Sequence, residues 1–156
     1  MISLIWAMTT QRVIGKENKI PWHIKEDLLY YKACTAGKTV FMGESTYYSL
    51  KGYYRDKPLP YGKIYVASFN SSLKLDDAIV VGNAEGFLKS TKEDIWVVGG
   101  ASIYAIALPF ADYLYISWIQ KNYEGDTYFP EFDLAKFKVL QERKTDLVVY
   151  SIYERV

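Results

Sequence analysis

Trp22 and Asp27 are the residues whose types and spacing could carry proton-handling chemistry. The stretch 14–32 reads IGKENKIPWHIKEDLLYYK, and its first part contains glycine and proline, as loops do. A helical pattern follows, with Glu26 and Asp27 in its first turn. A carboxylate beside a bulky indole, under a loop able to close, has the surroundings that general acid–base chemistry uses.

The role of Asp27 depends on the direction in which its side chain points. If it faces the predicted sheet, it is a carboxylate in apolar surroundings; desolvation raises the pKa of such a group, and a cationic ligand ring lowers it. If it faces water, it is an acid that favours the positive end of the helix dipole. The local sequence leaves both interpretations open, and Glu26 fits the second one better.

Two predicted strand-to-helix turns could bind phosphate. They read MGEST at 42–46 and VGGAS at 98–102. Each ends an apolar strand in glycine and opens a helix whose first N–H groups have no backbone partner, which is a common phosphate site. On neighbouring parallel strands, the two turns could hold both ends of a dinucleotide pyrophosphate. Neither is a GxGxxG motif or a P-loop, so plain turn glycines remain the alternative.

Other reactive residue types argue against several chemistries. His23 is the only histidine, which argues against a catalytic triad and against a metal site with several histidines, so no metal is expected. Cys34 is the only cysteine and cannot form an internal disulfide, so it is interpreted as a packed thiol in a reducing compartment. Asp126 lies in the turn EGDTYFP, where its expected role is structural.

Length, charge and hydropathy indicate a single soluble domain. The 156 residues fit a single domain over 1–156, and a formal charge of +1 argues against binding to nucleic acid or a membrane surface through net charge. No apolar run approaches the roughly 20 residues needed to cross a bilayer. The start MISLIWAM lacks the basic leader of a signal peptide, so a cytoplasmic protein is expected.

Strands and short helices alternate along the chain. Hydropathy predicts strands at 2–8, 39–42, 64–68, 78–82, 95–100, 113–119, 136–143 and 147–156, and helices at 25–36, 45–50, 84–90 and 101–108. This order predicts an α/β fold with a mostly parallel sheet and helices on both faces. The last two strands follow each other closely and suggest an antiparallel edge.

Taken in order, the motifs resemble dihydrofolate reductase. They are MISLIWAM, RVIGKENKIPWHIKEDL, VFMG with Ser45-Thr46, PLP at 58–60, VVGGASIY, and YEGDTYFP before the final strands. Each motif alone is weak, but the ordered set is specific and covers nearly the whole chain. The resemblance implies a three-layer α/β fold with a central eight-stranded, mostly parallel mixed sheet, an antiparallel C-terminal edge and four flanking helices.

The resemblance also implies a reaction. A hydride would pass from the nicotinamide of NADPH to dihydrofolate, giving tetrahydrofolate for one-carbon and thymidylate metabolism. Asp27 would bind the amino and ring N–H edge of the pterin and promote protonation of the ring nitrogen, while Trp22 would order a water. The segment 9–24 would be a mobile lid with Ile20 near its tip, and Asp126 would lie in the turn that supports it.

Further residues take expected roles from the resemblance. A cis peptide bond is expected between Gly99 and Gly100. The substrate-binding set comprises Ile5, Trp6, Ala7, Leu28, Tyr31, Leu50, Val98, Ser117, Lys32 and Lys63. The cofactor-binding set comprises Ala7, Ile14, Gly15, Ile20, Gly43, Ser45, Thr46, Ser68, Gly99, Gly100, Ala101, Ser102, Ile103 and Tyr104.

The chain departs from the family at the expected cofactor phosphate. Glu44 stands where the family usually has an arginine that faces the adenosine 2′-phosphate, and Phe69 and Ser102 stand where polar or basic residues are frequent. An acid near an adenosine ribose is a device by which other dinucleotide sites favour NADH. NADPH is the expected cofactor, and use of NADH is a second hypothesis.

A second departure concerns the glutamate tail of the substrate. The family's arginine for the tail carboxylate is expected at Gly62 and is missing. Lys63 or Arg55 could reach the same carboxylate, and Lys32 could help at the mouth of the pocket, although none guarantees the bidentate grip of arginine.

Two other readings remain open. One is a reductase of the same fold that acts on a ribosylated pyrimidine of the riboflavin pathway, which would explain the missing tail arginine. The other is a protein that binds folates without turnover. The main reading expects dihydrofolate as substrate, antifolates as inhibitors and a monomer.

Overall fold

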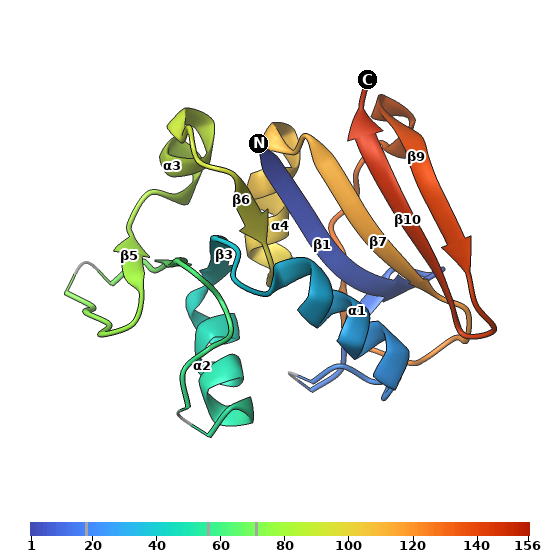
Figure 1. Ribbon diagram of the computed structural model, residues 1–156, viewed down its shortest axis with the longest axis horizontal. Coiled ribbons are helices and arrows are strands. Elements are labelled where there is room, and N and C mark those ends of the chain that lie inside the picture. The colour runs from blue at the N-terminus through green and yellow to red at the C-terminus, as the bar shows by residue number, and fades with distance from the viewer. Residues whose placement is uncertain (18, 56, 71) are drawn as a thin grey trace.

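A sheet of eight strands, in the order β5-β4-β3-β6-β1-β7-β10-β9, forms the centre of the molecule (Figure 1). The computed structural model describes residues 1–17, 19–55, 57–70 and 72–156. The strands from β5 to β7 in this order are parallel, whereas β10 is antiparallel to both of its neighbours. The predicted mixed sheet with an antiparallel C-terminal edge is therefore confirmed. The bounds are β1 (Ile2–Thr9), β3 (Val40–Gly43), β4 (Ile64–Ala67), β5 (Ile79–Val81), β6 (Ile95–Val97), β7 (Tyr113–Ile119), β9 (Phe137–Lys144) and β10 (Val148–Arg155).

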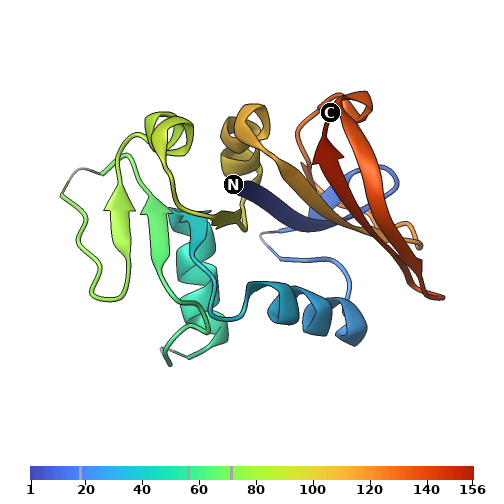
Figure 2. The ribbon, with the colours of Figure 1, turned by 45° about the horizontal axis from the view of Figure 1, so that its top comes forward.

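Four helices cover the two faces of this sheet. Helices α1 (Lys25–Thr35) and α2 (Glu44–Tyr53) lie on one face, and α3 (Ala84–Ser90) and α4 (Ala101–Ala107) lie on the other (Figure 2). Parallel strands need a crossover connection, which is usually a helix and is usually right-handed. Such connections place helices on both faces of the sheet. The predicted three layers and four helices are confirmed.

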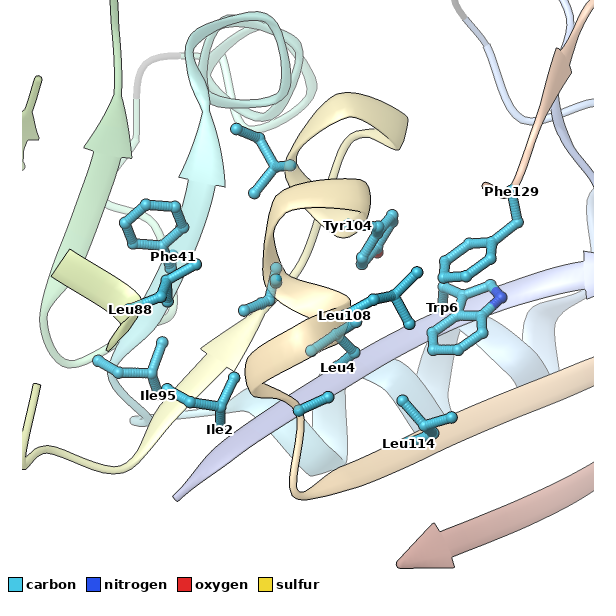
Figure 3. Packing of buried hydrophobic residues seen from close by; sticks show 14 of the residues in the cluster. Ile2, Leu4, Trp6, Phe41, Leu88, Ile95, Tyr104, Leu108, Leu114 and Phe129 are labelled. Carbon is cyan, nitrogen blue, oxygen red and sulfur yellow. The ribbon is translucent and has the colours of Figure 1, made fainter. Parts of the chain in front are cut away.

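Alternation along β1 divides the core between the two faces. Leu4 and Trp6 point toward α4, and their cluster includes Leu114 and Phe129 (Figure 3). Ile5 points the other way, into a cluster beneath α1 and α2. Because successive strand residues face opposite sides, β1 contributes to both cores and must be buried on both faces.

A small second sheet differs from the sequence prediction. Strands β2 (Val13–Gly15) and β8 (Thr127–Tyr128) pair antiparallel, in segments where the sequence indicated only loops. Both strands are too short to show a periodic pattern, and their pairing depends on contacts between distant parts of the chain. Of the predicted loop over 9–24, residue 18 lies outside the described residues.

Helix α2 is longer than predicted, and two short 3₁₀ helices complete the fold. The sequence indicated an end near Leu50, but α2 continues to Tyr53. The 3₁₀ segments are η1 (Leu108–Phe110) and η2 (Leu134–Lys136). Within the described parts of the chain, no helix is both long enough and apolar enough to span a membrane.

Candidate active site

Asp27 lies in the first turn of α1, where the helix passes over the centre of the sheet. The turn is closed by the Asp27 N–H, which donates to the Ile24 carbonyl at 3.1 Å. The carboxylate points toward β7, where the Ser117 hydroxyl is close enough to lower the pKa of Asp27. Ser117 lies between Ala7 of β1 and Tyr150 of β10 in the strand register. Asp27 therefore faces the sheet and is not the solvated first-turn acid of the alternative interpretation.

Burial and hydrogen bonds act in opposite directions on Asp27. Desolvation is the larger effect and raises the pKa of the carboxyl above its ordinary value. Hydrogen bonding from Ser117 lowers this pKa, the neighbouring charge of Glu26 raises it, and the Trp22 side chain lowers it slightly. A half-buried carboxylate with a raised pKa, held by a hydroxyl and an indole, is suited to binding a protonated ring.

Trp22 is fixed next to Asp27 by packing. Its side chain is buried in a cluster with Ile119, Val148 and Tyr150. Tyr150 was not predicted from the sequence, yet burial and then the charge of Asp27 raise its pKa to about 12. Its hydroxyl has no hydrogen-bond partner among the described residues. Tyrosines are too common in this chain for composition alone to single out Tyr150.

Apolar and tyrosine side chains extend the site along α1. Ile5 and Val98 are buried in one cluster, with Tyr31 and Leu50 packed against it. The Tyr31 hydroxyl lies 2.8 Å from that of Tyr61, a residue that the sequence did not indicate. These predicted wall residues therefore come together on the α1–α2 face. Leu28 also belongs to α1, and it is 42% exposed.

Two predicted substrate residues point away from this face. Trp6 lies in the α4-side core, where its ring stacks on Phe129 with centroids 3.9 Å apart. The Lys63 amine forms an ion pair with Glu93 at 2.8 Å and lies 3.4 Å from the Tyr65 hydroxyl. Strand alternation is the physical reason in both cases, because each residue neighbours one that faces α1 and α2. Neither side chain therefore lies with the other predicted substrate residues, and the predicted contacts of Trp6 and Lys63 with substrate stay predictions.

Lys32 is placed differently from Lys63. Its amine lies over the rings of Tyr53 and Tyr54, 5.5 and 5.8 Å from their centroids. No ion pair to Lys32 is found among the residues that the structure describes. Lys32 thus presents an uncommitted charge at the end of the α1–α2 face. Arg55 is exposed in the left-handed backbone region, with φ 51°.

The backbone at Gly62 excludes an arginine. A Cβ placed there would lie 2.6 Å from the Gly37 carbonyl oxygen, closer than side-chain carbons approach backbone oxygens. The Gly62 N–H donates to the Lys38 carbonyl at 2.9 Å, and the Gly37 N–H donates to the Pro60 carbonyl at 3.0 Å. The two segments are therefore held together at the position where the resemblance expected the tail arginine.

The two glycine turns meet at the carboxyl edge of β3 and β6, which are parallel neighbours. The Gly43 N–H donates to the Gly99 carbonyl at 2.8 Å, and the Gly99–Gly100 bond is cis, as expected. A Cβ at Gly43 would lie 3.0 Å from Ile103, and one at Gly99 would lie 3.4 Å from the Thr46 hydroxyl. The edge is therefore bare backbone with a hydroxyl beside it, which fits the close approach of a pyrophosphate.

The remaining predicted cofactor residues surround this edge. The buried Tyr104 hydroxyl donates to the Ile5 carbonyl at 2.7 Å and ties α4 to β1. Ser45 is exposed at the start of α2, and Ala101 and Ser102 open α4. Ser68 follows β4, the other neighbour of β3.

The predicted lid is tied to the small sheet. Asp126 accepts a hydrogen bond from the Glu17 N–H at 2.9 Å, and its own N–H donates to the Gly15 carbonyl at 3.0 Å. The bond from the Glu17 N–H is the largest cause of a lowered pKa at Asp126, followed by the bond from the Thr127 hydroxyl. Ile20 is 61% exposed, whereas Ile14 packs against the α4-side core. Asp126 thus has the structural role expected from its turn.

Comparisons with known proteins agree with this geometry. The family model described as "Dihydrofolate reductase" matches residues 1–151. The dihydrofolate reductase of Bacillus subtilis is 37% identical and covers 92% of this chain and 84% of its own. The type 3 dihydrofolate reductase of Salmonella typhimurium is 38% identical, covering 85% and 80%. The structure of Enterococcus faecalis dihydrofolate reductase complexed with NADP(H) and RAB-propyl superposes with TM-score 0.84 at 28% identity, covering 99% and 96%.

Proposed function

The chain belongs to the dihydrofolate reductase family, and we propose that it transfers a hydride from NADPH to 7,8-dihydrofolate, giving 5,6,7,8-tetrahydrofolate. The observation that carries this proposal is Asp27, half-buried on the sheet face of α1 between Trp22 and Ser117. NADPH supplies the hydride when it is bound. The protein's own residues bind and orient the pterin, exclude water and control one proton.

Asp27 binds the edge of the pterin that carries the amino group and the ring N–H. Its carboxylate accepts hydrogen bonds from that edge, and its negative charge favours the protonated ring. Ser117 fixes the carboxylate from the sheet side. The ring nitrogen next to the carbon that receives hydride gains its proton from water, and Trp22 orders a neighbouring water. The acid therefore acts by charge and position while the proton comes from solvent.

Binding and closure use the other residues that come together at the site. Ile5, Ala7, Leu28, Leu50 and Val98 provide the apolar pocket. With the cofactor bound, the backbones of Ala7 and Ile14 would hold the nicotinamide carboxamide, and Tyr104 would lie beside that ring. The lid excludes water when it closes over the site, with Gly15 and Ile20 near the cofactor and Asp126 holding the lid's base.

Lys32 provides the positive charge that binds the carboxylate of the substrate tail. It is a half-buried cation with an aromatic support from Tyr53 and Tyr54 and no ion-pair partner in the described ranges. Lysine offers a compact charge in place of the bidentate arginine fork. The tail carboxylate is therefore held by one positive charge.

The proposal extends to the setting of the enzyme. We propose one domain over residues 1–156 in the cytoplasm, because a single cysteine fits a reducing compartment. We also propose a monomer, which the family resemblance implies. Neither nucleic acid nor membrane is a partner in this proposal. Antifolates, whose ring edge resembles that of the pterin, bind at Asp27.

A spectrophotometric assay tests the function directly. Protein mixed with dihydrofolate and NADPH is expected to consume reduced-nicotinamide absorbance, and the rate should depend on Asp27. Folate binding without oxidation of either NADPH or NADH would favour a non-catalytic folate binder. Turnover of a ribosylated pyrimidine, with none of dihydrofolate, would favour the riboflavin-pathway reductase.

A further inference from the structure

Glu44 and Ser68 form a polar pair at the carboxyl edge of the sheet. Glu44 opens α2 directly after β3, and Ser68 directly follows β4. These strands are parallel neighbours, and Gly43 lies opposite Ala67 in their register. Glu44 and Ser68, the residues that follow this pair, therefore lie side by side. The Ser68 hydroxyl donates a hydrogen bond to the Glu44 carboxylate.

The Ser68 hydroxyl holds this carboxylate in one orientation. Ser68 is 7% exposed, and its Oγ accepts a hydrogen bond from the Asn70 N–H at 3.0 Å. With that lone pair in use, the hydroxyl proton points to Oε1 of Glu44. The other carboxylate oxygen, Oε2, has no hydrogen bond or ion pair from any residue that the structure describes. A half-buried, oriented acceptor is therefore open to a donor from a ligand.

The strand order places this pair at the adenosine end of the cofactor. In the order β4-β3-β6-β1, the VGGAS turn that follows β6 lies between Ala7 of β1 and the Glu44–Ser68 pair, which follows β3 and β4. A dinucleotide with its nicotinamide beside Ala7 and its pyrophosphate on the glycine turns must place its adenosine over Glu44 and Ser68. This step depends on the proposed hydride transfer.

The charge beside Glu44 and Ser68 does not suit the 2′-phosphate of NADPH. Four parallel strands end in the turns 43–46, 67–70, 81–84 and 99–102, and Glu44 is the only charged residue in all four. Phosphates are usually held by arginine, lysine or several N–H donors. In dinucleotide sites, an acid at a strand end accepts a hydrogen bond from a ribose hydroxyl, whereas a nearby arginine accommodates the 2′-phosphate.

Phe69 provides an apolar surface beside the pair. Its side chain is fully exposed, at 104% of the reference accessibility, and directly follows Ser68. An exposed aromatic ring is costly to leave in water, and nucleic-acid bases stack readily on such rings. The ring is therefore suited to an adenine whose ribose lies over Glu44.

We propose that Glu44, oriented by Ser68, binds the ribose 2′-hydroxyl of NADH, with Phe69 against the adenine, so that this chain uses NADH at least as well as NADPH. Glu44 is then the residue that sets cofactor specificity. The 2′-phosphate of NADPH brings about two negative charges toward a carboxylate. The 2′-hydroxyl of NADH instead donates to Oε2.

Binding of cofactor fragments tests the proposal without any turnover. The full-length protein is titrated calorimetrically with ADP-ribose and with 2′-phospho-ADP-ribose. The wild type is expected to bind ADP-ribose at least as tightly. Glu44→Gln should improve binding of the phosphorylated fragment roughly tenfold, since it removes one like charge at close range, and Glu44→Arg should improve it further. Glu85→Gln, which removes an exposed acid from the first turn of α3, is the matched control and should change neither affinity.

Kinetics then separate this inference from the proposed function. The inference predicts that kcat/KM with NADH equals or exceeds kcat/KM with NADPH, and that Glu44→Arg reverses the order. A wild type that prefers the phosphorylated fragment and NADPH more than tenfold, unchanged in Glu44→Gln, would overturn the inference and leave the reductase function intact. Fragment preference as expected, with no dihydrofolate turnover by either cofactor, would overturn the reductase function alone.

Phe69→Ala should weaken the binding of both fragments equally, by about tenfold. An unchanged affinity would show that Phe69 is not part of the site.

Discussion

The centre of the site and its two outer contacts follow different rules in this chain. At the centre, Trp22, Asp27 and Ser117 come from three segments and lie close together, with Trp22 and Ser117 buried. At the periphery, Glu44 lies at the proposed adenosine end of the cofactor site, and Gly62 stands where the resemblance expected the tail arginine; neither has the chemistry of an arginine. We infer that the reaction constrains the residues around the reacting ring. The ends of the cofactor and of the substrate can be bound by other groups.

The substitution Asp27→Asn tests most directly whether the centre of the site performs the chemistry. If the centre performs the chemistry, kcat/KM for dihydrofolate should fall about 10²–10⁴-fold at pH 7, the usual range for a group that controls proton transfer. Glu26→Gln is the matched control, because Glu26 lies one residue away and accepts from the Thr145 hydroxyl at 2.7 Å. Its kcat/KM should change less than about threefold. A loss of similar size in both variants would mean that Asp27 has no special role.

The pH profile of the same variant identifies the mechanism. Burial raises the pKa of Asp27, so the carboxyl keeps its proton to a higher pH than a solvated acid does. The reaction needs one proton on the pair of carboxyl and pterin, so the hydride-transfer rate should fall as pH rises above the pKa of that pair. In Asp27→Asn this falling limb should move to more acid pH. A limb at the same pH in both proteins would show that another group controls the proton.

Much of the fold follows from local sequence. The strand at 113–119 and the helix at 84–90 were predicted with their observed bounds, because each is an apolar or amphipathic run between clear turn residues. The β2–β8 sheet was missed, because three-residue and two-residue strands carry no period and their partners lie over one hundred residues apart. Long-range pairing of short segments is not encoded in any local pattern.

The centre of the site was predictable, but the directions of several side chains were not. Asp27 emerged from its place in a helical first turn, and its orientation had to come from the fold. Lys63 was expected at the substrate tail, but a one-residue alternation places it with Glu93 on the opposite face. The close approach of Gly62 to Gly37 likewise exists only in three dimensions. Strand facing and backbone proximity are thus the missing information.

Gly62→Arg tests whether the tail contact was merely lost or is structurally excluded. The new side chain would force Gly62 away from the Gly37 carbonyl, and such overpacking typically costs about 1–3 kcal/mol in the free energy of unfolding. The affinity for dihydrofolate should not improve. Urea unfolding and the KM for dihydrofolate measure the two effects.

Gly52→Arg is the control for this substitution. A Cβ at Gly52 meets no atom within 4 Å, so the same arginine there should leave stability unchanged or raise it by up to about 1 kcal/mol, because arginine favours a helix more than glycine does. A stable Gly62→Arg variant with a lowered KM would break the distinction drawn for the periphery, because the usual arginine would then fit this backbone.

Lys32→Met sharpens the comparison at the substrate tail. The KM for dihydrofolate should rise about twofold to fivefold, the scale of one partly exposed charge contact, while kcat stays within about twofold. The KM for 7,8-dihydropterin, which lacks the tail, should not change. Lys63→Met is the matched control and should affect neither substrate, because its charge is paired with Glu93. Equal KM increases for both substrates would place Lys32 at the pterin and not at the tail.

The smallest expected effect is on the free energy of unfolding, which burial of the Asp27 carboxylate lowers. Because the folded-state pKa of Asp27 is raised, the folded protein binds more protons than the unfolded chain between the ordinary carboxyl pKa and the raised one. Stability therefore falls as pH rises through that window, and the loss is complete above it. Asp27→Asn should make the ligand-free protein about 1 kcal/mol more stable at pH 7, and this gain should vanish as pH falls to the ordinary carboxyl pKa.

The effect of Asp126 on stability has the opposite sign, because the pKa of its carboxyl is lowered. Asp126→Asn should therefore destabilise the protein at pH 7. Urea denaturation at several pH values measures both, and a destabilised Asp27→Asn would show that the ionised carboxylate stabilises the fold.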